Sequence, residues 1–243
     1  MLRGLYNATA SLDAAAQAHD VVANNLAHAS MPGYRRRVVT QESFDQMLGQ
    51  SSGARTSPSA PRPMRVASHV VFSHGQAQYT GNSLDVALDG DGFFTFQGPK
   101  GPVYSRNGVF HKNADGSLLS SGGLAVLGSG GPITLPATYA NLMIRDDGTI
   151  IVDGSEVGKL QIAHFQSPTQ LVPVGTTLFE APPGVQPGDG SSTVSQGVRE
   201  SSNVEIVTEL VQMILGMRQY EASQRILKAI SEAVQLSTSP QAG

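Results

Sequence analysis

The chain has 243 residues, of which 14 % are charged, and its formal net charge is −3. This balance argues against a nucleic-acid-binding protein, which needs a basic surface, and against a highly charged disordered chain. The absence of cysteine excludes disulfides and every cysteine-based metal or nucleophile site, and no cofactor is expected.

A helix is predicted from the first residues to about Ala29. Its mostly apolar and small seam residues alternate in steps of three and four, the heptad spacing of a helix that packs along another helix. They are Leu2, Leu5, Thr9, Leu12, Ala16, His19, Ala23 and Leu26. A turn at residues 30–34 should end the helix, because Pro32 disfavours helix at the preceding residue and Gly33 permits a positive φ.

Three arginines follow the turn, Arg35, Arg36 and Arg37. In a chain of net negative charge, a solvated or intersubunit face is a better interpretation of this run than a phosphate-binding patch. Residues 50–65 are rich in Ser and Pro and are read as a linker or irregular arm.

The middle of the chain is predicted to be β. Short apolar-alternating segments are separated by Asn-Gly and Asp-Gly pairs, which are typical of hairpin turns. The expected strands lie at 70–72, 77–79, 84–88, 93–96, 103–105, 109–111, 118–119, 124–127, 133–135, 142–144, 150–152 and 159–165. Asp89, Asp91, Asp146 and Asp147 belong to such turns rather than to a cation site, because no downstream Glu completes a Ca²⁺ loop. The six histidines show no metal-binding spacing.

The last patterned stretch, residues 202–236, predicts one long helix. Its seam again steps by four and three, through Ile206, Leu210, Met213, Met217, Tyr220, Gln224, Leu227, Ser231 and Val234, and a second apolar set at Val207, Val211 and Ile214 widens the face. Ser202 and Glu205 fit a capping box at its start. Gly216 costs about 1 kcal/mol relative to Ala; it is either simply tolerated or marks a close contact with another helix, and the second interpretation is slightly favoured.

These elements predict an α+β fold with a mainly β centre. The expected order is an N-terminal helix and turn (1–36), an arm (37–83), a central antiparallel β domain (84–165), a return arm (166–200) and a C-terminal helix (201–243). A helix this long needs a partner, so the two terminal helices are expected to form a coiled-coil pair. The sequence leaves open whether that pairing is within one chain or between subunits.

Four motifs in order resemble those of the bacterial flagellar rod and hook proteins. Residues 22–34, VANNLAHASMPGY, resemble the signature A-N-N-(L/I)-A-N-x-x-T-P-G-(F/Y), with His28 and Met31 as departures. Residues 84–94 resemble L-D-(V/A)-A-I-x-G-x-G-F-F, and residues 104–110 resemble Y-(T/S)-R-(N/D)-G-x-F. Residues 202–204, 213–214 and 218–222 resemble the C-terminal S-N-V…M-I…x-R-x-Y-E-A.

The resemblance implies a structural, non-catalytic subunit of the flagellar basal-body rod. It implies polymerisation through the terminal helices into the axial driveshaft, with copies of itself and other rod and hook proteins as partners. Export through the flagellar type III apparatus is implied, and the sequence agrees, since residues 1–18 lack the pattern of a cleaved secretory signal. No apolar stretch is long enough to span a membrane. The short arm favours the proximal-rod type, FlgF, over the distal-rod type, FlgG.

The expected assembly interface consists of the signature turn and the two seams. Its residues are Leu5, Leu12, Asn24, Asn25, Leu26, Pro32, Gly33, Tyr34, Ile206, Leu210, Met213, Met217, Tyr220 and Leu227. Two alternatives stay open: a non-flagellar β-rich binding module oligomerised by its terminal helices, and a glycan-acting enzyme with paired carboxylates on the β domain.

Overall fold

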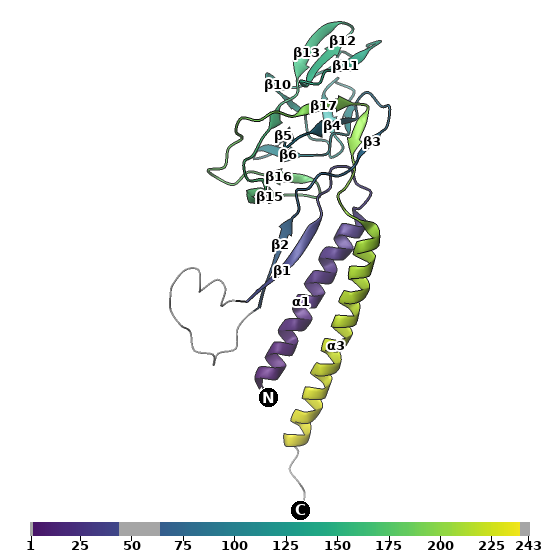
Figure 1. Ribbon diagram of the computed structural model, residues 1–243. Coiled ribbons are helices and arrows are strands. Elements are labelled where there is room, and N and C mark those ends of the chain that lie inside the picture. Colours follow the sequence, from purple (N-terminus) through teal and green to yellow (C-terminus); the bar gives the residue numbers. More distant parts are fainter. Residues whose placement is uncertain (1, 44–63, 239–243) are drawn as a thin grey trace, which may run out of the picture. The chain divides into compact units, whose positions relative to one another are not determined.

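The computed structural model describes residues 2–43 and 64–238, and its chain divides into two compact units (Figure 1). The first unit holds residues 2–27, 37–43, 64–71 and 205–238 of the described chain, and the second holds residues 28–36 and 72–204. The predicted arm at 50–65 lies outside the described residues except for its last two. Each unit is therefore assembled from separated stretches of sequence.

The first unit contains the two long helices and a hairpin-like sheet. Helix α1 spans Leu2–Ala27 and helix α3 spans Ile206–Thr238, and the two lie side by side in Figure 1. Their directions are antiparallel, because the end of α1 contacts the start of α3 through Asn25 and Glu209. Strands β1 (Arg37–Ser43) and β2 (Met64–Val70) pair antiparallel and contact α1.

The helices occupy nearly the predicted ranges, but the predicted capping box is wrong. Helix α3 begins at Ile206. The hydroxyl of Ser202 accepts a hydrogen bond from the Val204 N–H, and the carboxylate of Glu205 accepts one from the Thr208 hydroxyl. Glu205 thus sits just before the first turn instead of at its third position. Among the described residues, no helix combines the length and the hydropathy needed to cross a bilayer.

The second unit is built from short antiparallel strands. They are β3 (Ala77–Tyr79), β4 (Val86–Asp89), β5 (Phe93–Gly98), β6 (Gly101–Ser105), β7 (Phe110–Lys112), β8 (Leu118–Ser120), β9 (Leu127–Gly128), β10 (Gly131–Pro132), β11 (Leu142–Ile144), β12 (Thr149–Val152), β13 (Ser155–Lys159), β14 (Ile162–Ala163), β15 (Val172–Pro173), β16 (Leu178–Glu180), β17 (Thr193–Gln196) and β18 (Val198–Glu200). One short 3-10 helix, η1, spans Pro168–Gln170. The described chain is therefore mainly β with one long helix toward each end, as the sequence predicts.

The largest sheet has the order β14-β5-β6-β16-β15, and every pair in it is antiparallel. Strands β11, β12 and β13 form a second sheet, where Asp153-Gly154 make a two-residue turn with φ of +49° and +85°. These positive values are those of a type I′ hairpin turn. Strands β17 and β18 return late in the chain to pair with β4 and β3.

The hydrophobic core lies among these strands. Phe94, Phe96, Leu118, Ile150 and Val86 are almost completely buried in it. Aromatic side chains also pack edge to face, with ring centroids 5.2 Å apart for Phe94 and Phe110. Burial of a side chain of this size stabilises the fold by about 1.5–3 kcal/mol. The β unit therefore has a core of its own.

Candidate assembly site

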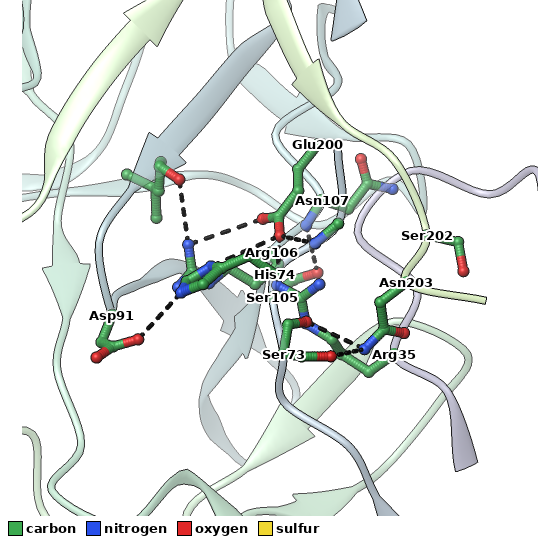
Figure 2. Close-up of polar contacts among 12 residues, drawn as sticks. Arg35, Ser73, His74, Asp91, Ser105, Arg106, Asn107, Glu200, Ser202 and Asn203 are labelled. Carbon is green, nitrogen blue, oxygen red and sulfur yellow. Dashed lines mark hydrogen bonds and ion pairs between the residues drawn. The ribbon is translucent and has the colours of Figure 1, made fainter. Parts of the chain in front are cut away.

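Glu200 is the centre of a buried polar cluster in the second unit (Figure 2). Its Oε1 atom lies 2.7 Å from Arg35 Nη2 and accepts a hydrogen bond of 2.8 Å from the Gly75 N–H. Its Oε2 atom lies 3.7 Å from Arg106 Nη1. Since only 4 % of Glu200 and 2–3 % of each arginine are exposed, the cluster holds two buried cations around one buried carboxylate.

Arg106 is fixed by the backbone as well as by Glu200. Its guanidinium donates to the carbonyl oxygens of Leu88 and Gly90, and it lies over the Phe93 ring, 5.4 Å from the centroid. Burial lowers the pKa of Arg106 to about 10, and the nearby Glu200 carboxylate opposes that shift. The guanidinium therefore stays charged at neutral pH.

The turn at residues 30–34, which ends the signature motif, is hydrogen-bonded to the backbone of Glu200 in the same cluster. Gly33 has a φ of +68°, and its N–H donates to the Glu200 carbonyl oxygen at 2.9 Å. A Cβ at this position would lie 2.3 Å from the backbone nitrogen of Asn107, so only glycine fits. Tyr34 is buried and its ring stacks on His28 with centroids 5.2 Å apart. The φ of Gly33 confirms the positive value that the sequence predicted at this position.

Asn203 fastens the stretch that follows Glu200. Its Oδ1 atom accepts a hydrogen bond from the Arg36 N–H at 2.6 Å, and its Nδ2 atom donates to the Ser73 carbonyl oxygen at 3.0 Å. Together with Glu200, it joins three segments of the β unit, 33–36, 73–75 and 200–203. These are the segments through which the chain enters and leaves this unit.

The structure corrects the interpretation of the arginine run for one member. Arg35 was expected on a solvated or intersubunit face, but its side chain is buried against Glu200, 165 residues away in sequence. No local sequence pattern predicts the Arg35–Glu200 pair. Arg106 lies in a family-like motif, which was the one available signal, whereas nothing in the sequence singles out Glu200.

In the first unit, Asn25 connects three elements. Its amide pairs with both backbone groups of Arg37, accepting from the N–H at 2.9 Å and donating to the carbonyl oxygen at 2.7 Å. It also donates to Glu209 Oε2 at 3.2 Å. Asn25 and Glu209 are both at most 1 % exposed. A buried polar contact of this kind fixes the register of neighbouring elements.

The face of α3 that is covered within the chain is narrower than the apolar surface of the helix. Its buried and half-buried residues between Glu209 and Ile230 are spaced mainly by heptad steps: Glu209, Met213, Gly216, Ser223, Leu227 and Ile230. Several are small or polar. The other large apolar residues at the start of the helix stay 43–70 % exposed instead, namely Ile206, Val207, Leu210, Val211, Ile214, Leu215 and Met217.

A groove runs between α1 and α3. It consists of hollows of about 400 and 940 Å³ that share Glu221 and Gln224. Both predicted seams supply its walls, with Thr9, Leu12, Ala16 and His19 from α1 and Met217, Tyr220, Gln224, Leu227 and Ser231 from α3. The seams therefore converge on one face of the helix pair without filling it.

The remaining predicted interface residues are distributed over both units. Leu5 lies in α1, Leu12 and Leu26 are half-buried there, and the Asn24 amide donates to the Asp20 carbonyl oxygen. Pro32 is half-buried in the turn. Asn25, Gly33 and Tyr34 serve contacts within the chain, whereas Ile206, Leu210, Met217 and Tyr220 present at least 36 % of their surface to solvent.

Two family descriptions match the chain. Residues 87–152 match the "Flagellar hook protein FlgE/F/G D1 domain", and residues 195–238 match the "Flagellar basal body rod FlgEFG protein C-terminal". The first range lies within the β unit. The second covers β18, the segment after Glu200 and the whole of α3.

Individual relatives match over nearly their whole length. The flagellar basal-body rod protein FlgG of Buchnera aphidicola subsp. Baizongia pistaciae is 30 % identical over 258 residues, covering 97 % of this chain and 98 % of the relative. FlgG of Bacillus subtilis is 29 % identical over 257 residues, with 97 % of each chain covered. The basal-body rod protein FlgF of Mesorhizobium japonicum is 29 % identical over 231 residues, with 94 % and 93 % covered.

Proposed function

The chain belongs to the flagellar basal-body rod protein family, and from that premise we propose that it polymerises through its terminal helices into the axial rod that joins motor to hook. The family is one of structural flagellar rod proteins and is not known as an enzyme. The alternative of a glycan-acting enzyme would need paired carboxylates in a cleft, and a muramidase assay tests it directly.

The exposed apolar turns of α3 carry this proposal. From Ile206 to Met217 the only charged residue is Glu209, and that side chain is fully buried. A helix that is apolar all round is ordinarily buried on all sides. Here α1 covers one side alone, so the other sides require neighbouring helices. A coiled-coil arrangement of terminal helices from several subunits supplies them.

The expected partners are copies of this chain and other rod and hook proteins. Placement in the basal body follows from the family, and the route through the flagellar type III export apparatus is part of the proposal. Contacts between different faces of identical subunits generate an open helical assembly, which suits an axial structure.

We favour the proximal-rod type, FlgF, over the distal-rod type, FlgG. Identity does not separate them, since it is 29–30 % with the FlgG relatives described above and 29 % with the FlgF relative. The FlgG alignments extend over 257–258 residues, more than the 243 of this chain, and so open gaps in it. The FlgF alignment extends over 231 residues and covers 94 % of this chain, so it opens far fewer gaps in it.

The proposal is tested with Leu210→Asp combined with Met217→Asp. Two carboxylates on the exposed turns of α3 should leave the β unit folded and abolish incorporation into the rod and swimming, because burying an unpaired charge is strongly unfavourable. Met143→Asp is the matched control, since Met143 is equally exposed but lies on β11 in the other unit. Normal motility of the double variant, measured in soft agar, contradicts the proposal.

A further inference from the structure

Residues 181–192 connect β16 to β17, and we call this segment the strap. It is rich in proline and glycine and forms no strand or helix. Residues 183–184 and 186–191 are exposed, and within the strap the Val185 N–H donates a hydrogen bond to the Pro182 carbonyl oxygen at 3.0 Å. An exposed segment of this kind depends on a few contacts with the rest of the β unit for its position.

His164, the residue after β14, provides those contacts. Its carbonyl oxygen accepts a hydrogen bond of 2.8 Å from the Gly188 N–H, and its Nε2 atom lies 2.9 Å from Ser192 Oγ. The backbone of Gly190 lies against the imidazole ring, since a Cβ at this position would clash with ring atoms Cγ and Cδ2. Among the described residues, both hydrogen bonds that join the strap to the rest of the β unit therefore end on His164.

The turn between β4 and β5 covers the Ser192–His164 pair. A Cβ at Gly92 would lie 2.8 Å from Ser192 Oγ and 3.3 Å from His164 Nε2, and a Cβ at Gly90 would lie 3.2 Å from Ser192 Oγ. A serine that attacks a substrate needs open space beside its hydroxyl, whereas here backbone packs against it. The pair is therefore a structural contact that positions the strap.

The position of His164 disfavours a charged imidazole. Burial lowers the pKa of His164, the guanidinium of Arg106 acts in the same direction, and the carboxylate of Asp91 opposes both. Asp189, the charged residue of the strap itself, is exposed. Detachment of the strap would return the ring to water, where a histidine ionises near pH 6.5. Protonation therefore favours the detached strap over the bound one.

We propose that His164 is a pH-sensitive anchor, which holds the strap against the β unit at neutral pH and releases it in mildly acidic solution. Because the bound state has the lower pKa, its stabilisation is complete above about pH 6.5 and decreases as the pH falls below that value. Strand β17 begins at the residue after the strap and pairs with β4, so release also frees the approach to that strand. The inference goes beyond the proposed function, since it concerns the single chain before any assembly.

Hydrogen exchange of the full chain, measured by mass spectrometry at pH 7.5 and pH 5.5 and corrected for the intrinsic exchange rate, tests the proposal. Peptides covering residues 181–192 should lose protection at the lower pH, while peptides covering β5 should keep theirs. In NMR spectra, the His164 ring should titrate below about pH 6.5.

His164→Gln separates the anchor from other acid effects, because glutamine forms hydrogen bonds but does not titrate. The strap of this variant should show the same protection at both pH values. His111→Gln is the matched control, since His111 is an exposed histidine on β7, and its strap should still lose protection in acid.

Equal protection of the strap at both pH values in the unsubstituted chain would overturn the proposal. So would an acid-induced loss that persists in His164→Gln, or a loss that extends to β5 and so reports unfolding of the whole β unit. If His164→Gln does not fold, the unsubstituted chain still decides: a His164 ring that titrates above pH 6.5 contradicts the anchor.

Discussion

At the scale of single residues, Glu200 matters because two buried guanidinium groups share its one carboxylate. The cluster carries excess positive charge, because two buried arginines face one carboxylate. In addition, Arg35 Nε and Nη1 and Arg106 Nε form no hydrogen bond within the described chain. Removing the carboxylate leaves two cations uncompensated, whereas removing Arg35 leaves Glu200 with Arg106 and the Gly75 N–H. The two ends of this ion pair are therefore not equivalent.

We predict that Glu200→Gln destabilises the β unit more than Arg35→Met does. The first change should cost about 3–5 kcal/mol, the range for breaking a buried ion pair, and the second change less. Urea unfolding followed by circular dichroism measures both. Asp189→Asn is the control, because Asp189 is exposed and lies outside the cluster, so it should change the free energy of unfolding by less than about 0.5 kcal/mol. Equal losses for the two variants would contradict the proposed asymmetry.

Asp147 predicts an acid-sensitive contribution to stability. Its carboxylate accepts hydrogen bonds from the Thr149 N–H and hydroxyl and from Lys159 Nζ. The Thr149 N–H in particular lowers the pKa of Asp147 from 3.8 to about 2. Because the folded-state pKa is depressed, the stabilisation is complete above pH 4 and is lost as the pH falls from about 4 to 2.

The stability difference between the unsubstituted chain and Asp147→Asn should therefore shrink over that pH interval. Thermal unfolding of both proteins between pH 6 and pH 2 measures it. A difference that stays constant down to pH 2 would show that ionised Asp147 does not contribute.

At the scale of elements, the sequence predicted what local pattern determines. The heptad steps located both helices, and the Gly-containing turns located most strands, including β3, β5, β11 and β12. The Glu200 cluster was missed because its members are brought together by tertiary structure, with Arg35 and Glu200 165 positions apart. The capping box failed because Ser202 and Glu205 use their oxygens for Val204 and Thr208.

The prediction placed the α3 seam in the correct heptad register but did not identify which of its residues the chain itself buries. Met213 and Leu227 do turn toward α1, yet small and polar residues, Gly216 and Ser223, share that face. Where apolar residues occupy more than one face of a helix, as in the first turns of α3, the pattern alone cannot say which face its own chain covers. The apolar surface of α3 that the chain itself leaves exposed is the feature that indicates contacts with other subunits.

Gly216 gives a prediction at this scale. An added Cβ would lie 3.9 Å from His19 Nδ1, an ordinary van der Waals distance, so Gly216→Ala fits without strain. We expect it to stabilise α3 by about 1 kcal/mol through helix propensity and to leave rod incorporation unchanged. Ala222→Gly, at an exposed position of the same helix, should cost a similar amount. Thermal unfolding monitored by the helical signal measures both, and a destabilising Gly216→Ala would mean that the glycine serves a closer contact.

At the scale of the whole molecule, the two units are built from alternating stretches of the chain but have separate contact networks. The helix pair depends on α1, β1, β2 and α3, whereas the β core lies wholly in the other unit. Damage to the helices should therefore leave the β core intact.

Gln219→Pro tests this independence. Proline in the interior of α3 costs about 3 kcal/mol or more, because it removes a backbone hydrogen bond and clashes with the preceding turn. We expect loss of helical circular dichroism and of rod incorporation, with the NMR methyl signals of Val86, Leu118 and Ile150 unchanged. Collapse of these signals would show that the units do not fold separately.

The late pairing of β17 with β4 and of β18 with β3 has a consequence for synthesis. A ribosome releases the chain from its N-terminus, so β3, β4, Arg35 and Arg106 all emerge before the strands and the carboxylate that complete them. The β unit cannot close until Glu200 has been translated, and contacts this distant in sequence form slowly. The β unit of the nascent chain therefore stays incompletely folded for most of translation, and an incompletely folded chain is compatible with passage through a narrow export channel.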